Sequence, residues 1–290
     1  MTARFGELVS VIIPTYNRAD QIRGSIDSVL QQTYHNLEVI IVDDGSTDGT
    51  FEKVNQWYQD CDRLIYVFND GNYGVSASRN NGVRYAHGDM IAFQDSDDLW
   101  RPEKLEKQME AFCTADDQTA LNYCSMLRYY DNGEIEYWPP RMWPDEVKHG
   151  ALFPFLLLNC LVDTPTMLLK KSAFWEAGGF NEELKALEDY EFTLRLSKLF
   201  NIQYIDEILF DGKIDQGING NTEEKILSQC YVLEKYHDDL KQYGEIKQKL
   251  QSVMLEATVY GKRDIFYELM KNSVYCEYQE YADLMKKVEI

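Results

Sequence analysis

The sequence predicts an α/β protein: a mostly parallel sheet with helices on both faces, followed by a helical C-terminal appendage. As far as residue 112, short runs rich in Val and Ile alternate with helical patterns. Polar residues follow three of these runs, which is expected where parallel strands end at a ligand site. After residue 220 the pattern is helical almost to the end. We therefore expect one domain over 1–220 and a helical region over 221–290.

Each element of the first half has its own signal. Ile22, Ile26 and Val29 share one face of a helix over 19–32. Thr47 supplies capping chemistry for the next helix, and Pro102 suits the first turn of another. The expected strands cover 9–13, 37–42, 64–68 and 90–93, and the remaining expected helices cover 47–58, 75–86 and 102–112.

The second half changes character. The turn at 131–133 favours a hairpin of two strands. The apolar run from Ala151 to Val162 is interrupted by Pro154 and Asn159, and we interpret it as a buried helix because it is too short to span a bilayer. We further expect hairpin strands over 119–130 and 134–138, a strand over 163–170, a helix over 188–200 and a short β pair over 202–210.

Composition narrows the class of protein. The formal charge of −20 disfavours nonspecific binding to nucleic acid or to an anionic membrane surface, since both require basic patches. The six cysteines form no CxxC pair and lack a histidine at ligand spacing, so we expect reduced thiols rather than disulfides or a zinc site. Residues 1–8 carry no signal segment. We expect a cytoplasmic protein without a transmembrane segment.

The common nucleotide-binding motifs are missing. No G-x-G-x-x-G follows the first strand, and no G-x-x-x-x-G-K-[ST] occurs in the chain. A dinucleotide-binding Rossmann site and a P-loop are therefore disfavoured despite the α/β pattern.

The stretch after the fourth expected strand is the most informative. Asp95, Asp97 and Asp98 place three carboxylates within four residues, and such groups repel one another unless a cation or hydrogen-bond donors lie between them. Hard oxygen ligands suit Mg²⁺ or Mn²⁺, which also bind phosphate oxygens. The alternative is an acidic surface turn that caps the helix beginning near Pro102.

The stretches after the first and second strands have two interpretations each. Asp43 can accept hydrogen bonds from a base or a ribose hydroxyl, while Asp44, Ser46 and Asp48 fit a turn and a helix cap. Tyr16 can stack on a base, or it can simply pack against its neighbours.

Together these stretches resemble the family 2 glycosyltransferases. The order and spacing of five motifs carry the resemblance, and a later GGFNE at 178–182 and an acidic pair at 188–189 extend it to about residue 210. The five motifs are VSVIIPTYN at 9–17, SVLQQTY at 28–34, EVIIVDDGSTD at 38–48, GVSASRN at 74–80 and DSDD at 95–98.

The resemblance implies the glycosyltransferase A fold, with a nucleotide-sugar half over about 8–100 and an acceptor half over about 101–220. It also implies a nucleotide diphosphate sugar as donor, a divalent metal, Mn²⁺ or Mg²⁺, and inversion at the anomeric carbon. Asp97 is then the metal ligand, assisted by Asp98 unless that residue only caps a helix. The donor-binding residues are Pro14, Thr15, Tyr16, Asp43, Arg79, Asn80, Asp95 and Trp100, with a structural role for Asn80 and core packing for Trp100 as alternatives.

Transfer with inversion requires a carboxylate that removes the proton of the acceptor hydroxyl. In the family the second acid of a pair such as Glu188 and Asp189 has this role, which makes Asp189 the expected base. The competing interpretation is that both acids only complement the dipole at the start of a helix. Many relatives also carry a basic or His-containing segment that touches the diphosphate. The corresponding 212–220 has no histidine, and Lys213 is its candidate substitute.

We expect a hexosyl- or N-acetylhexosaminyltransferase that uses a UDP-sugar and a carbohydrate or glycolipid acceptor, in polysaccharide or glycoconjugate synthesis at the inner face of the membrane. The alternatives are a catalytically silent subunit that binds sugar nucleotides and a nucleotidylyltransferase. The latter lacks its usual glycine-rich basic loop here. The C-terminal helices could pair subunits, and we expect the segment from Thr222 onward to be dispensable for nucleotide binding.

Overall fold

The computed structural model describes residues 6–214, 222–276, 278 and 281. The strands are β1 (Val9–Thr15), β2 (Leu37–Asp43), β3 (Leu64–Phe68), β4 (Met90–Phe93), β5 (Leu99–Trp100), β6 (Thr119–Tyr130), β7 (Ile135–Trp138), β8 (Met167–Lys170) and β9 (Asn201–Ile214). The helices are α1 (Ile22–Leu30), α2 (Thr50–Tyr58), α3 (Val75–Tyr85), α4 (Lys104–Thr114), α5 (Phe153–Leu156), α6 (Lys171–Glu176), α7 (Glu188–Ser197), α8 (Thr222–Lys235), α9 (His237–Tyr243), α10 (Ile246–Val259) and α11 (Arg263–Lys271).

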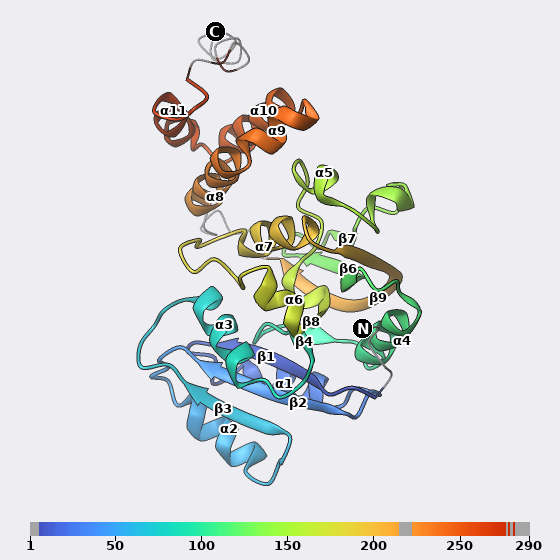
Figure 1. Ribbon diagram of the computed structural model, residues 1–290. Coiled ribbons are helices and arrows are strands. Elements are labelled where there is room, and N and C mark those ends of the chain that lie inside the picture. The colour runs from blue at the N-terminus through green and yellow to red at the C-terminus, as the bar shows by residue number, and fades with distance from the viewer. Residues whose placement is uncertain (1–5, 215–221, 277, 279–280, 282–290) are drawn as a thin grey trace.

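Within these residues, a single mixed sheet organises the chain (Figure 1). Its order is β3-β2-β1-β4-β8-β6-β9-β5, and β7 pairs with β6. The first four strands are parallel to one another, while β8 runs antiparallel between β4 and β6. The chain order reverses between β1 and β4, so the carboxyl ends of these two strands flank a switch point at which ligands bind in such sheets. The predicted mixed, mostly parallel sheet is confirmed.

The apolar residues of β1 divide between two cores because successive side chains of a strand point to opposite faces. Val11 packs with α1, α2 and α4, whereas Ile12 packs with α3, α6 and α7. α3 lies very close to the sheet: a Cβ on Gly82 would be 2.5 Å from a methyl carbon of Ile12. This close approach fixes the position of α3, which carries Arg79 about one turn before Gly82.

Three expectations for the second half need correction. The leucines and Phe153 of 151–162 are largely buried, but Ala151 and Pro154 are exposed, and the segment forms only one helical turn, α5. The side-chain amide of Asn159 then donates to the carbonyl of Phe155. The segment 163–170 begins with a 3₁₀ turn around Pro165, so its strand is restricted to β8. Residues 202–210 belong to one long strand, β9, which runs beside β6 with register shifts instead of folding back on itself.

The C-terminal helices share a core with the rest of the chain. α8, α10 and α11 pack on one another, and their buried apolar side chains continue the cluster that contains Phe153 and Phe192. Figure 1 shows α7 between the sheet and these helices. The predicted C-terminal helices are therefore observed, and their core is continuous with that of the preceding domain. Within the described residues, no helix is both long and apolar enough to cross a membrane.

Candidate active site

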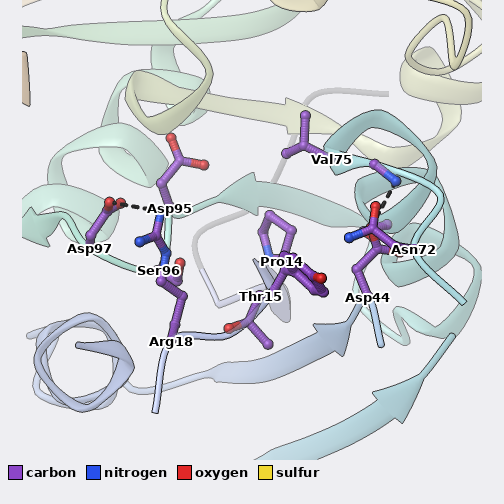
Figure 2. A pocket seen from close by; sticks show the side chains of 12 residues that line it. Pro14, Thr15, Arg18, Asp44, Asn72, Val75, Asp95, Ser96 and Asp97 are labelled. Carbon is purple, nitrogen blue, oxygen red and sulfur yellow. Dashed lines mark hydrogen bonds and ion pairs between the residues drawn. The ribbon is translucent and has the colours of Figure 1, made fainter. Parts of the chain in front are cut away.

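A cavity of about 340 Å³ lies at the switch point between β1 and β4 (Figure 2). Loops after β1, β2 and β4, together with the start of α3, contribute its walls, as the polar strand ends predicted. Its lining residues are Pro14, Thr15, Tyr16, Arg18, Asp44, Asn72, Gly74, Val75, Ser78, Asp95, Ser96 and Asp97.

The loop after β1 is bound on one side to the loop after β2, and its other side faces the cavity. The backbone N–H of Asn17 donates to Ser46 Oγ at 2.9 Å, and Asn17 Oδ1 accepts from the N–H of Thr47 at 2.8 Å. Tyr16 is 48% exposed over the cavity. The hydroxyl of Thr15 is buried in the cavity wall and has no hydrogen-bond partner among the described residues. A buried hydroxyl without a partner is rare in native structures, and a bound water or a ligand in the cavity would supply the missing partner.

The two aspartates at the end of β2 differ from expectation: Asp44 lines the cavity, and Asp43 has the structural role. Asp43 is buried and does not belong to the lining, because its carboxylate accepts from the Ser46 N–H and from the Tyr66 hydroxyl, both at 2.7 Å. Asp44 does line the cavity, and it accepts from the N–H groups of Tyr73 and Gly74 at 3.0 and 2.7 Å. These contacts fix the loop before α3, which forms one wall of the cavity.

The three carboxylates after β4 lie in different environments. Asp95 is half-buried and bonds Arg79 at 2.8 Å, while Asp97 is exposed in the cavity and faces Arg18 at 3.5 Å. Figure 2 shows the pair of Asp97 and Arg18 at one end of the cavity. Burial, reinforced by the negative charges of Asp95 and Asp97, raises the pKa of Asp98 to about 7. The cluster is therefore electrostatically unfavourable as it stands.

This arrangement fits a metal that arrives with a diphosphate. No group of three or more His, Cys, Asp or Glu side chains within the described part of the chain is placed to hold a metal on its own. Mg²⁺ and similar ions in phosphate sites use one or two protein carboxylates and take their other ligands from phosphate and water. Asp97 offers an exposed carboxylate in the lining of the cavity. A cation bound there would relieve the repulsion between Asp98 and its neighbours Asp95 and Asp97.

A second cavity of about 270 Å³ shares Asp95 with the first. β6, β9 and the first turn of α7 bring its residues together. Its lining residues are Arg79, Asp95, Asp98, Met126, Arg128, Asp163, Thr164, Pro165, Phe210, Gly212, Lys213, Glu188 and Asp189.

Arg79 connects the two cavities from α3. Its guanidinium is buried and bonds Asp95 at 2.8 Å and Glu188 at 2.7 Å. Burial alone would lower its pKa, but the two carboxylates raise that pKa above the usual range. Arg79 is thus a fixed cation, and its ionic partners stand at the end of β4 and at the start of α7.

Asp189 stands at the wall of the second cavity in the first turn of α7. Burial, with the negative charges of Glu188 and Asp163, raises its pKa to about 7, although a backbone N–H bond and Arg79 lower it in part. The N–H of Thr164 donates to its Oδ2 at 3.3 Å. Leu187, just before the helix, has φ of 55°, a left-handed conformation that costs a non-glycine residue about 1–3 kcal/mol. A half-buried carboxylate that titrates near neutral pH suits a general base.

Besides Asp43, two more predicted donor-binding residues line neither cavity. The side-chain amide of Asn80 exchanges two hydrogen bonds of 2.9 Å with the backbone of Phe180, and therefore joins α3 to the loop after α6. Trp100 is 4% exposed in the core under the sheet, where its ring faces Lys104 Nζ at 3.9 Å. The structure thus places both in the packing roles that the sequence left open.

Sequence reasoning missed several lining residues. Arg18 follows the Pro-Thr-Tyr-Asn motif directly, so its position gave a usable signal. Arg128, Asp163 and Thr164 come from segments without any motif, and only the tertiary fold brings them to the second cavity. Lys213 is exposed at that cavity, and its N–H lies 3.5 Å from Asp98 Oδ1. Residues 215–220 of the expected closing segment lie outside the described residues.

Comparison with known proteins assigns the family. The model of "Glycosyl transferase family 2" matches residues 10–178, which include the carboxylates after β2 and β4. The chain belongs to glycosyl transferase family 2. The predicted resemblance is confirmed, and the protein is a glycosyltransferase.

Similar sequences also belong to proteins that are named as glycosyltransferases or as a polysaccharide synthase. An uncharacterised glycosyltransferase of Rickettsia prowazekii is 30% identical over 278 residues, which cover 95% of this chain and 84% of the relative. The hyaluronan synthase of Pasteurella multocida is 28% identical over 288 residues, and the match covers 98% of this chain but only 27% of that enzyme.

Solved structures confirm the glycosyltransferase A fold. Residues 1–349 of Staphylococcus aureus TarS, in complex with UDP, match 93% of this family 2 chain and 73% of that structure, with a TM-score of 0.58 and 21% identity. The mannosyltransferase PcManGT of Pyrobaculum calidifontis, in complex with GDP-Man and Mn²⁺, matches 97% of this chain and 79% of that structure, with a TM-score of 0.63 and 18% identity.

Proposed function

We propose that this glycosyltransferase moves a sugar from a nucleotide diphosphate sugar to an acceptor hydroxyl, with metal assistance and with inversion. One observation carries the proposal: a cavity suited to a nucleotide and a cavity with a basic carboxylate meet at Asp95. The nucleoside would lie against Pro14, Thr15 and Tyr16, and the donor sugar would reach Asp95. The acceptor would enter from the side of Asp189.

The reaction needs one proton transfer and one displacement. Asp189 takes the proton of the acceptor hydroxyl while that oxygen forms a bond to the anomeric carbon. The bond between the anomeric carbon and the diphosphate oxygen breaks on the opposite face, and the electron pair leaves with the nucleotide. A single displacement of this kind converts an α-linked donor into a β-linked product.

Neighbouring residues prepare this step. Arg79 holds Glu188 and Asp95 at 2.7 and 2.8 Å, so it fixes the entrance to α7 relative to the end of β4. Asp97, assisted by Asp98, would hold Mn²⁺ or Mg²⁺, and this ion would neutralise charge on the departing diphosphate. We assign Lys213 to the diphosphate as well, because its exposed side chain stands at the edge of the second cavity.

Relatives support a UDP-sugar as the donor. TarS has been solved in complex with UDP and with UDP-GlcNAc, and a hyaluronan synthase is among the relatives, whereas PcManGT was solved with GDP-Man. We therefore propose a hexosyl- or N-acetylhexosaminyltransferase. The relative TuaG of Bacillus subtilis, named as a putative teichuronic acid biosynthesis glycosyltransferase, is 46% identical over 103 residues. These names favour a carbohydrate or glycolipid acceptor in the synthesis of a cell-surface polysaccharide.

We place the reaction in the cytoplasm, at the inner face of the membrane. All six cysteines are free thiols, which is typical of a reducing compartment. The acceptor would then be presented at the membrane surface.

The second candidate is a catalytically silent subunit that binds sugar nucleotides. The raised pKa of Asp189 favours catalysis, because carboxyl groups whose pKa lies near 7 in a cavity are found mostly at catalytic sites. Hydrolysis of the donor sugar in the presence of Mn²⁺ separates the two: turnover by the intact chain supports the enzyme, and its absence with tight donor binding supports the subunit.

A panel of nucleotide sugars tests the donor site. We expect one nucleotide class to raise the melting temperature of the protein with Mn²⁺ and to do so much less with EDTA. Asp97→Ala should remove the Mn²⁺-dependent part, while Asp117→Asn, which alters an exposed carboxylate in the turn after α4, should keep it. If the calorimetric affinity of Asp97→Ala for UDP with Mn²⁺ equals that of the unaltered protein, the metal assignment is wrong.

A further inference from the structure

Three side chains of the C-terminal helices bond the residues on either side of the proposed base. Lys249 Nζ donates to the hydroxyl of Tyr190 at 2.9 Å, and Lys235 Nζ donates to Glu191 Oε1 at 2.6 Å. Ser228 Oγ donates to the carbonyl of Ala186 at 2.7 Å. These contacts therefore act next to Leu187, the residue with positive φ before α7, and on the first turn of α7. All three donors lie beyond residues 10–178, the segment that the family model matches.

Lys249 is an unusual residue for a helix that only packs. It is 1% exposed, and its partner Tyr190 is fully buried and donates in turn to the carbonyl of Leu157 at 3.0 Å. Burial lowers the pKa of Lys249 to about 8, which means that the charged amine is destabilised in this position of the core. A methionine would fill the same space without that destabilisation. The polar contact to Tyr190 is therefore the feature that distinguishes lysine at this position.

Lys235 of α8 supplies a second cation to Glu191 in the same turn of α7. Glu191 is fully buried and is bound by Arg195 Nη2 at 2.7 Å and by Lys235 at 2.6 Å. Arg195 also donates to the backbone carbonyls of Ala177 and Gly179. The first turn of α7 is thus held on one side by the loop after α6 and on the other by α8.

We propose that Lys235 and Lys249 are positioning residues for the transfer reaction: they hold the first turn of α7 so that Asp189 stands at the acceptor cavity. This inference rests on the proposed function of Asp189 as the base. It assigns the C-terminal helices to the catalytic unit, whereas the sequence predicted only that this segment is dispensable for nucleotide binding.

The far end of α7 provides a matched control. Lys198 Nζ contacts Asp239 of α9 at 2.6 Å, the same distance as the pair of Lys235 and Glu191, and the two lysine side chains are 39% and 34% exposed. Both pairs join α7 to the C-terminal helices. Lys198, however, lies just beyond the last residue of α7, while Lys235 acts at the first turn. A purely structural role predicts that replacement of either lysine leaves the kcat of the folded protein unchanged.

The main experiment compares Lys235→Met with Lys198→Met in the full chain. We expect a larger loss of melting temperature for Lys235→Met, because Glu191 is fully buried whereas Asp239 is 24% exposed. At a temperature where both variants are folded, we expect a roughly 10- to 100-fold lower kcat for Lys235→Met alone, because small misplacements of a reacting group have effects of that size. The KM for the donor should stay unchanged in both, and Lys235→Arg should restore most of the rate. Equal kcat values for Lys235→Met and Lys198→Met would overturn the proposal.

A second arm tests Lys249 through its partner. Lys249→Met should lower kcat, but its addition to Tyr190→Phe should lower kcat no further, because Tyr190→Phe has already removed the hydrogen bond to Lys249 together with the one to the Leu157 carbonyl. Effects that multiply in the double variant would overturn a role that acts through Tyr190.

Asp189→Asn is measured in parallel. If it transfers sugar at the normal rate, the base assignment fails. If it is impaired while Lys235→Met has the same kcat as Lys198→Met, only the positioning role fails.

Discussion

The replacement of Asp189 by asparagine removes the proton acceptor and keeps the size of the side chain. A positioned general base contributes about 10²–10⁴-fold to a rate, which corresponds to about 3–5 kcal/mol of transition-state stabilisation. Donor affinity should be preserved, because the residues of the nucleotide cavity do not include Asp189. A loss of turnover with unchanged donor binding is expected for an interaction that is used in the transition state.

The dependence of the rate on pH provides the sharper measurement. Because the pKa of Asp189 is raised to about 7, the base is mostly protonated at pH 6 and mostly ionised at pH 8. The value of kcat/KM for the acceptor should therefore rise about tenfold per pH unit below pH 7 and level off above it. An ordinary aspartate, with a pKa of about 4, would give a flat profile over the same range.

The same raised pKa predicts an effect on stability. A carboxylic acid whose pKa is higher in the folded protein than in the unfolded chain stabilises the fold below pH 4, and this contribution is lost as the pH rises through 7. Three pH units correspond to at most about 4 kcal/mol, and solvent screening of the half-buried carboxylate reduces that figure. Asp189→Asn should consequently raise the melting temperature at pH 8, with little change at pH 4.

Transfer assays on purified protein, from pH 5.5 to 8.5 at saturating donor, check the first part, and thermal unfolding checks the second. The product of an α-linked donor should be β-linked. A pH-independent rate over this range, a retained configuration, or normal transfer by Asp189→Asn would each refute the reasoning.

Three further outcomes follow from individual contacts. Arg79→Met should move the midpoint of the pH–rate profile upward, because the positive charge of Arg79 lowers the pKa of Asp189, and should weaken donor binding; an unshifted midpoint would contradict this electrostatic link. Thr15→Val should lower nucleotide affinity about 3- to 15-fold without loss of stability, since the buried hydroxyl has no partner among the described residues; calorimetry and unfolding measure the two effects. Gly82→Ala should destabilise the fold by about 1–3 kcal/mol in denaturant unfolding, because the added methyl would meet Ile12.

The donor half of the fold could be predicted because its signals are local. A strand such as β1 is a Val- and Ile-rich run with polar residues directly after it, and the rule for parallel sheets then places those residues at one edge. The same rule correctly joined the Pro14 loop to the Asp95 cluster, although they are far apart in sequence. Local patterns were sufficient here because each strand contributes its own end to the cavity.

The acceptor half could not be predicted in the same way, because its residues depend on tertiary contacts. Asp163 directly precedes the 3₁₀ turn of Thr164–Thr166. Arg128 lies 2.6 Å from the carboxylate of Asp163 because β6 runs between β8 and β9. The aspartates after β2 show a finer limit. Asp43 and Asp44 are neighbours of the same type, and the sequence does not distinguish them. Asp43 is held away from the cavity by the hydroxyl of Tyr66, which lies 23 residues later in the chain.

Arg79 explains why the two cavities form one site. A guanidinium that is 4% exposed is tolerated only when carboxylates compensate it, and here one carboxylate comes from each side of the reaction: Asp95 from the donor side and Glu188 from the turn that carries the base. If α7 moved away from β4, Arg79 would keep a buried charge with half of its partners. The same ion pairs that stabilise the buried arginine therefore fix the distance between Asp95, at the proposed donor site, and Asp189, the proposed base. In the proposed mechanism, stability of the fold and alignment of the reactants thus depend on the same contacts.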